Sequence, residues 1–279
     1  MKIENRNLGK QALLIFFAIV ILLSAVVETL ICLGAPEWLY LILMWIPAIA
    51  ATAANVVSFH ENGAPFTVKK LFALGGFRMC KLRYMLLGCL LPLAYLLIPY
   101  MAYWLFNPQN FAYRGVPLAL ILKDILPVLV IGVLTSLLSA LGEEIGWRGF
   151  MFPALYAKLG LNRALLISSL FWCGWHLPLL IGGDYMPGTP LWYQLPAFVL
   201  CIFPVGVMAG LLTLESGSMW PAAFLHAAHN NYDQMVFGVI TAGSDKMYFV
   251  SETGALTILC AWALAAILYI RVKRRAKHL

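Results

Sequence analysis

Charged residues are scarce in this chain of 279 residues: they make up 11% of it, against 62% hydrophobic residues. Soluble domains carry about 25% charged residues and no more than about 50% apolar ones. The composition therefore excludes an ordinary soluble domain and indicates a chain built for a lipid bilayer. No internal repeat is visible, and no segment between the apolar runs is long enough to fold as a separate soluble domain. Any chemistry must lie within the apolar part.

Several protein-chemical signatures are missing as well. The six cysteines form no CxxC pair and no metal-type spacing, so we interpret them as small core residues. The HExxH helix of common zinc proteases does not occur. The one Gly-Gly-Asp, at 182–184, lies in a predicted loop without a second aspartate motif, and no serine sits in a rhomboid-like G-x-S-G. Intramembrane proteases of the aspartyl and rhomboid types therefore fit poorly.

Runs of about 20 apolar residues mark candidate transmembrane helices. They predict an all-α, polytopic membrane protein with about eight such helices. We expect one integral-membrane domain over residues 1–279, with a catalytic helical core in residues 120–240. The predicted spans are 11–33, 37–58, 84–106, 120–147, 163–183, 190–212, 219–240 and 253–271.

The basic residues predict how these helices are oriented, because loops rich in Lys and Arg stay in the cytoplasm. With both termini cytoplasmic, 16 of the 19 basic residues fall on the cytoplasmic side, which leaves Arg114, Lys123 and Lys246 outside. The net charge of +7 is then explained by attraction to anionic membrane lipids, and it requires no nucleic-acid partner. We predict an integral protein of a bacterial cytoplasmic membrane.

Acidic and imidazole side chains inside the apolar runs are the most informative feature. Each ionisable group costs a few kcal/mol or more in a bilayer, so such groups are functional candidates. Glu143 shares a helical stripe with small residues, which predicts that it points into the bundle. Glu144 lies four residues before Arg148, the favourable order for an ion pair on one helical face. The pair leaves Glu143 free for chemistry.

Two further runs carry histidines. His176 shares a face with Trp172, and the nearby Pro178 predicts a helix bend that would suit a polar site. His226 and Asn230 lie four residues apart on one predicted helix, where both can act on a single small group. Each signal has a structural alternative. The Glu144–Arg148 pair, or a lone histidine such as His229, could simply link helices, and Trp172 could simply be a packing residue.

The depths of the candidate residues disagree. At 1.5 Å per residue, His226 lies about 10 Å into its predicted span, whereas His176, counted from Arg163, lies about 20 Å into its own. Helix tilt, the bend at Pro178 or a later start of the fifth span could bring these residues to one level. Glu143 lies near the cytoplasmic end of its span, so we expect the site to open toward the cytoplasm.

Three segments, EEIGWRGF, FWCGWHLP and SGSMWPAAFLHAAHNN, resemble the signature segments of the CAAX-protease and bacteriocin-processing (abortive infection) family of intramembrane proteases, to which the Ras-converting enzyme belongs. The resemblance implies that Glu143 activates a water, that His176 and His226 assist, and that Asn230 helps to stabilise the oxyanion. Trp172 stands where the family usually has Phe. Glu144, Arg148 and Trp172 are the expected supporting residues.

The resulting prediction is an intramembrane endopeptidase that cleaves membrane-associated peptides or lipidated proteins near the cytoplasmic face. We assign no metal. If zinc is present, its expected ligands are Glu143, His176 and His226, residue types that bind zinc with a position left for water. A non-catalytic bacteriocin-immunity or scaffold protein is the alternative from another class. A transporter ranks last, because the paired inverted repeats common in transporters are not visible.

Overall fold

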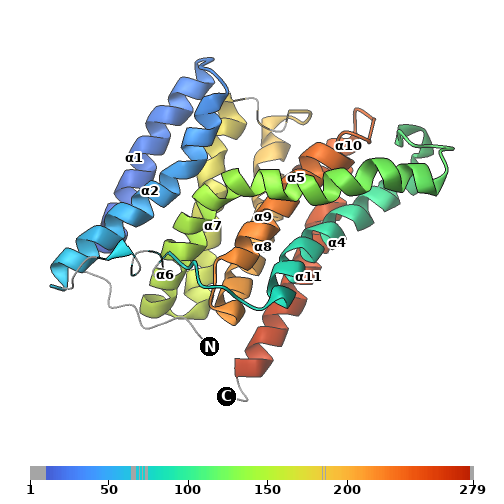
Figure 1. Cartoon of the computed structure of the whole chain (residues 1–279). Coiled ribbons are helices and arrows are strands. Elements are labelled where there is room, and N and C mark those ends of the chain that lie inside the picture. Colours follow the sequence, from blue (N-terminus) through green and yellow to red (C-terminus); the bar gives the residue numbers. More distant parts are fainter. Residues whose placement is uncertain are drawn as a thin grey trace.

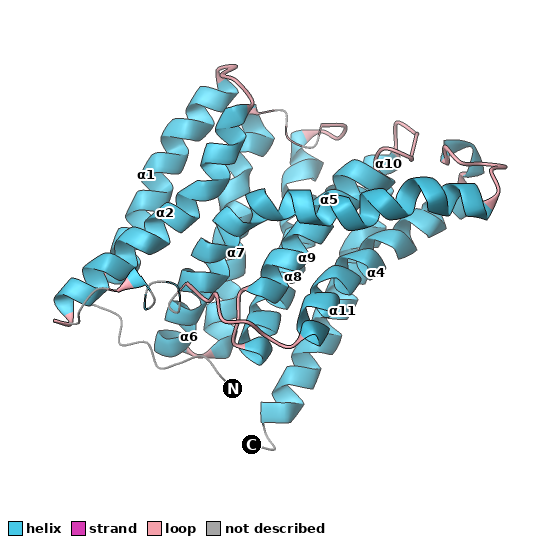
Figure 2. Ribbon diagram, in the orientation of Figure 1, coloured by secondary structure: helices cyan, strands magenta, loops and turns pink. Residues whose placement is uncertain are grey.

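A computed structural model describes residues 11–276, apart from 64–66, 69, 71, 73, 74, 184 and 186. Within this part the chain is almost entirely helical, as Figure 2 shows, and its one β-bridge joins Phe111 to Thr241. The predicted all-α architecture is confirmed. The α-helices are α1 (Ala12–Cys32), α2 (Trp38–Glu61), α4 (Leu82–Phe106), α5 (Leu118–Gly146), α6 (Phe152–Leu159), α7 (Leu161–Gly182), α8 (Leu191–Ser216), α9 (Trp220–Asn230), α10 (Lys246–Phe249) and α11 (Ala255–Ala276).

Seven helical segments among the described residues are long and apolar enough to cross a membrane. They correspond to seven of the predicted spans, and the polytopic membrane architecture is confirmed. The remaining prediction, 219–240, corresponds to α9 and a π-helical stretch, Asn231–Phe237. The helix α9 has only 11 residues and carries polar side chains, so it does not qualify as an apolar span by itself.

The position of α9 explains its composition. It packs against α4, α5 and α8, and most of its residues are buried. In Figure 1, α1 and α2 form one edge of the molecule, α4 and α11 lie at the other, and α5 runs across the bundle. A helix enclosed by others needs no apolar surface toward lipid, and it can therefore carry the polar groups of a site.

Small residues let α5 approach its neighbours closely. A side chain at Gly142 would meet the backbone of Met44 on α2, and one at Gly146 would meet Pro47 on the same helix. On the predicted stripe, Gly132 faces Asn231. Close helix approach through small residues is the usual packing mode in lipid. The contacts hold α5 between α2 and α9, and they fix the direction in which Glu143 points.

Two of the helices that carry site residues, α5 and α9, change from α-helical to π-helical winding directly after their motifs. The helix α5 continues into a π-helical stretch, Trp147–Met151, which leads to α6. The helix α9 continues into the π-helical stretch Asn231–Phe237. Single π-helical turns inside helices occur frequently at functional sites. Each widened turn here shifts the side chains after Glu144 and after Asn230 relative to an ideal α-helix.

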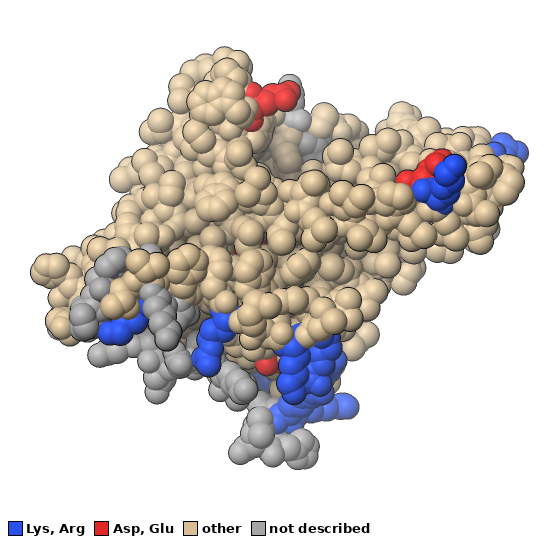
Figure 3. Space-filling view, in the orientation of Figure 1, with Lys and Arg blue, Asp and Glu red and all other residues tan. Residues whose placement is uncertain are grey.

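Charge is unevenly distributed over the visible face. Figure 3 shows basic side chains gathered along the end of the molecule at which, in Figure 1, both chain ends lie. The last turn of α11 contributes Lys273, Arg274 and Arg275 to this end. Arg271 and Arg275 also pair with Glu215 at the end of α8, with N to O distances of 3.7 and 3.0 Å.

Candidate functional site

Glu143 is the buried acid around which the site is organised, with only 1% of its side-chain surface exposed. One carboxylate oxygen, Oε2, accepts hydrogen bonds from the indole N–H groups of Trp147 at 3.0 Å and Trp172 at 2.9 Å. An indole N–H can only donate, so Oε2 is an acceptor. The other oxygen, Oε1, lies 4.0 Å from Nε2 of His226 and accepts no hydrogen bond from a described residue. Its lone pairs remain available.

Glu144 points to a different set of partners. Its Oε1 accepts from the Arg148 guanidinium at 2.7 Å and lies 3.0 Å from Nδ1 of His226. The predicted Glu144–Arg148 pair is therefore present, and both side chains are buried. Arg148 also lies over the Trp172 ring, 4.4 Å from its centre. The second oxygen, Oε2, is buried without a partner in the described structure, which is costly in an apolar interior.

These contacts define the protonation pattern of His226. Because the Glu144 carboxylate only accepts hydrogen bonds, Nδ1 of His226 must donate to it. In the neutral ring, Nε2 then carries the lone pair, and it faces Oε1 of Glu143. The arrangement resembles catalytic and metal-binding imidazoles in general, in which a carboxylate partner on one nitrogen fixes the role of the other.

His176 is fixed by the same logic. Its Nδ1 lies 2.9 Å from the backbone carbonyl of Trp172, so Nδ1 donates and Nε2 carries the lone pair in the neutral ring. Nε2 has no hydrogen-bond partner among the described residues, and the side chain is half-buried. Aromatic rings of Trp175, Tyr185 and Phe198 surround it, with centres 5.0, 6.3 and 5.5 Å away. These aromatic rings pack against the imidazole ring, while its Nε2 keeps a free lone pair.

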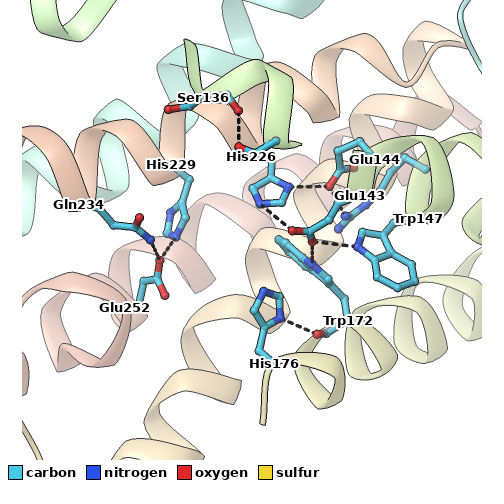
Figure 4. A network of polar contacts seen from close by, with 12 residues as sticks. Ser136, Glu143, Glu144, Trp147, Trp172, His176, His226, His229, Gln234 and Glu252 are labelled. Atoms are coloured by element: carbon cyan, nitrogen blue, oxygen red, sulfur yellow. Dashed lines mark hydrogen bonds and ion pairs between the residues drawn. The ribbon is translucent and has the colours of Figure 1, made fainter. Parts of the chain in front are cut away.

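Trp172 connects the three groups. Its indole donates to Glu143, its carbonyl accepts from His176, and its ring lies 5.2 Å from that of His226. The interpretation of Trp172 as a packing residue was therefore incomplete, because the side chain also donates to the central carboxylate. Figure 4 shows the Glu143 carboxylate next to the His226 ring and the Trp172 indole, with His176 on the other side of Trp172. The predicted convergence of α5, α7 and α9 is present.

The depth mismatch expected from the sequence does not separate these groups. The helix α7 begins at Leu161, so a later start of this span is not the explanation. The hydrogen bond of 2.9 Å between Trp172 and Glu143 places the second half of α7 beside the end of α5. Since α5 crosses the bundle instead of running parallel to α7 (Figure 1), residue counts along the two helices do not measure the same direction.

Asn230 ends α9, one turn after His226. Its side chain is half-buried and makes no hydrogen bond to the described part of the chain. The donor and acceptor of its amide are thus free. The structure places Asn230 on the predicted helix but gives it no direct contact with Glu143 or His176, so its role in stabilising an oxyanion stays a prediction.

Some site residues were missed in the sequence analysis. Trp147 follows Glu143 by four residues, and that spacing alone could have identified it as a partner on the same helical face. His229 pairs at 3.1 Å with Glu252, a buried acid that lies outside all three motifs. Its other ring nitrogen lies 2.9 Å from the hydroxyl of Tyr95. No helical spacing links Glu252 or Tyr95 to the motifs, so only the tertiary structure reveals them.

The residue types of the site suit a zinc ion, since a glutamate oxygen and two imidazole nitrogens have free lone pairs and their other atoms are held by outer partners. Geometry does not support this use: within the described ranges, no three His, Cys, Asp or Glu side chains are close enough to hold a metal ion. We therefore assign no ligand set.

Comparisons with known proteins agree with the motifs. Residues 125–232 match the family described as type II CAAX prenyl endopeptidase Rce1-like. The CAAX prenyl protease 2 of Methanococcus maripaludis is 30% identical over 150 residues, which cover 52% of this chain and 51% of that protein. The chain thus matches about half the length of this curated relative. The resemblance to the CAAX-protease family is confirmed, and the matched region contains Glu143, His176, His226 and Asn230.

Proposed function

We propose that this chain, a member of the CAAX-protease family by the match of residues 125–232, is an intramembrane endopeptidase in which Glu143 activates a water molecule. The observation that carries the proposal is the set of free acceptors at the site. Oε1 of Glu143 and Nε2 of both His176 and His226 lack a hydrogen-bonding partner among the described residues. A water has two protons to donate, and such acceptors can receive them.

In the proposed reaction, Oε1 of Glu143 removes a proton from the water as the oxygen attacks the carbonyl carbon of the peptide bond. A C–O bond forms, and the carbonyl π electrons move to the oxygen. Glu143 then returns the proton to the amide nitrogen, and the C–N bond breaks to release the amine. The two indole donors stay on Oε2 throughout. They keep the carboxylate in place, so that only Oε1 exchanges the proton.

The oxyanion requires donors. Nε2 of the neutral His226 ring accepts the second proton of the attacking water, and the resulting Nε2–H then donates to the oxyanion while Nδ1–H remains bonded to Glu144; this proton is lost again when the carboxylate product leaves. The amide of Asn230, free of other partners and one turn further along α9, is the second proposed donor. One such donor contributes about 3–4 kcal/mol in well-studied enzymes. Trp172 and Arg148 are the proposed supporting residues. Trp172 donates to Glu143 and Arg148 donates to Glu144, so each acid is held by its own partner.

We further propose that the site opens toward the cytoplasm and acts on prenylated or other membrane-associated peptides of a bacterial cytoplasmic membrane. Supporting the orientation, α9 begins next to the segment between α2 and α4, which carries Lys70, Arg78 and Lys81: the backbone N–H of Met219 donates to the carbonyl of Gly76. His226 lies six residues into α9, about 9 Å from that end. The name of the relative, a CAAX prenyl protease, supports the substrate class.

The test uses purified full-length protein in lipid nanodiscs and a fluorescence-quenched peptide with a prenylated cysteine near its C-terminus. Glu143→Gln keeps the size of the side chain and removes the base, so cleavage should fall by about 10²- to 10⁴-fold. Glu37→Gln, at an exposed acid before α2, is the matched control and should leave the rate unchanged. Undiminished cleavage by a folded Glu143→Gln variant would overturn the proposal. An unprenylated peptide, run in parallel, reports whether the lipid is required.

A further inference from the structure

A second buried polar cluster, which the proposed mechanism does not use, lies next to the site. Its centre is Glu252, on a short helical turn between α10 and α11 (Ser251–Thr253), with 1% of its side chain exposed. The carboxylate accepts from the Tyr185 hydroxyl at 3.0 Å and from the Gln234 amide at 3.3 Å. His229 is its third partner, at 3.1 Å. Figure 4 shows the His229, Gln234 and Glu252 contacts apart from those of Glu143.

The donors around Glu252 favour its ionised form. Tyr185 and Gln234 use their O–H and N–H groups on it, so they donate. His229 completes the set: when Tyr95 donates its hydroxyl proton to Nδ1 of the neutral ring, Nε2–H points to Glu252. Burial raises the pKa of the Glu252 carboxyl, but the hydrogen bonds that His229 and Tyr185 donate to it outweigh this effect and hold the pKa below its ordinary value. A full negative charge is thus kept inside the bundle.

That charge reaches the hydrolytic site through one side chain. The ring of Tyr185 lies against His176, with ring centres 6.3 Å apart and planes inclined by 33°. The hydroxyl of the same ring is fixed on Glu252. The Glu252 carboxylate is also close enough to His176 to favour positive charge on that ring. Phe198 packs on both Tyr185 and His176, at 6.1 and 5.5 Å, so the two rings share one wall.

We propose that Glu252 is a positioning residue for His176: through the hydroxyl of Tyr185 it holds the aromatic wall against the imidazole, and its charge favours the positive character that the ring gains while Nε2 binds the activated water. This inference rests on the proposed function. Glu252 touches neither the substrate nor the water. It acts by keeping the lone pair of His176 in the direction set by the Nδ1 to Trp172 hydrogen bond.

The alternative is that the cluster only joins helices, and kinetics separate the two roles. A group that acts only in the transition state lowers kcat and kcat/KM equally when it is removed, whereas a structural group lowers the amount or stability of folded protein and leaves turnover of the folded fraction intact. Melting temperature, KM and kcat must therefore be measured on the same preparations in nanodiscs.

Tyr185→Phe is the first variant, because it removes the hydroxyl and keeps the ring beside His176. Displacement of a catalytic group by about 1 Å can cost 10²-fold, so we expect kcat to fall by about 10- to 100-fold with KM within about twofold. Tyr193→Phe is the matched control. Its hydroxyl donates to the carbonyls of Tyr248 and Thr253, so it anchors the same chain segment without contacting Glu252. It should leave kcat within about twofold.

Glu252→Gln removes the charge at constant size and should lower kcat to a similar degree. Because both variants break one connection, the double variant should be no slower than the slower single variant by more than about twofold. Turnover within about twofold of wild type in folded Tyr185→Phe and Glu252→Gln would overturn the inference, as would an equal loss in Tyr193→Phe. If wild-type protein and Glu143→Gln cleave alike, the proposed function itself has failed, so the two failures are distinguishable.

Discussion

Two polar clusters are centred on His226 and His229, which lie three residues apart on α9. The clusters differ in how many of their buried polar atoms have a hydrogen-bond partner. Around His226, Oε1 of Glu143 and the buried Oε2 of Glu144 have no hydrogen-bond partner among the described residues. Nε2 of His176 has none there either. Around His229, every buried side-chain oxygen and nitrogen of Tyr95, His229 and Glu252 that the structure describes has a hydrogen-bond partner.

The difference supports the His226 cluster as the place of the proposed chemistry. An unmade hydrogen bond of a buried polar group costs about 1–3 kcal/mol, and more for a charged one, so a purely structural network is expected to be complete. The His229 cluster meets this expectation. The His226 cluster leaves acceptors open, as a site that must bind and release a polar molecule requires.

The largest expected effect is on the rate and comes from His226→Ala. Loss of an imidazole that takes part in proton transfer or oxyanion stabilisation should lower kcat by about 10²- to 10⁴-fold. Circular dichroism and size-exclusion profiles check that the helical bundle is retained. A variant that cleaves at the wild-type rate would show that the open cluster is not the hydrolytic one.

Next in size is a loss of stability in Arg148→Met. The guanidinium is 3% exposed and neutralises Glu144, and removal of one partner of a buried ion pair costs about 3–5 kcal/mol. We expect a clearly lower free energy of unfolding in detergent titrations. Arg163→Met, at an exposed position on α7, is the control and should change it by less than about 0.5 kcal/mol. Equal behaviour of the two variants would contradict the assigned pair.

His229→Ala tests the second cluster in the same way. It leaves the Tyr95 hydroxyl and the Glu252 carboxylate without their shared partner, so the free energy of unfolding should fall by about 1–3 kcal/mol. Its effect on kcat should be smaller than that of His226→Ala. His60→Ala, an exposed histidine at the end of α2, serves as the control for the loss of an imidazole. A reversed ranking of the two rate effects would exchange the roles of the clusters.

The smallest expected effect is that of metal removal. Because no three ligand-type side chains come close together in the described residues, dialysis against a chelator should leave the cleavage rate unchanged, and zinc content by mass spectrometry should be far below one ion per chain. Full loss of activity with rescue by added zinc would instead make Glu143, His176 and His226 ligands, as the residue types permit.

Helix geometry explains which contacts could be predicted. The Glu144–Arg148 pair depends only on a spacing of four residues, and it is present at 2.7 Å. The small-residue stripe predicted that Glu143 faces inward, and it does. The spacing of Trp172 and His176 predicted that both lie on one face of their helix. It did not predict the hydrogen bond from Trp172 to Glu143, because that bond depends on how α7 lies against α5.

The sequence by itself determined the membrane character, seven of the helices and the identity of the acids and histidines, since each follows from composition or from periodicity along one helix. Only the tertiary structure decided that α9 is enclosed instead of facing lipid, that crossing helices bring Trp172 to Glu143, and that Glu252 is bonded to Tyr185. The reason is physical: sequence spacing fixes neighbours within a helix, whereas contacts between helices depend on crossing angles, and these are set by the close packing of small residues such as Gly142 and Gly146.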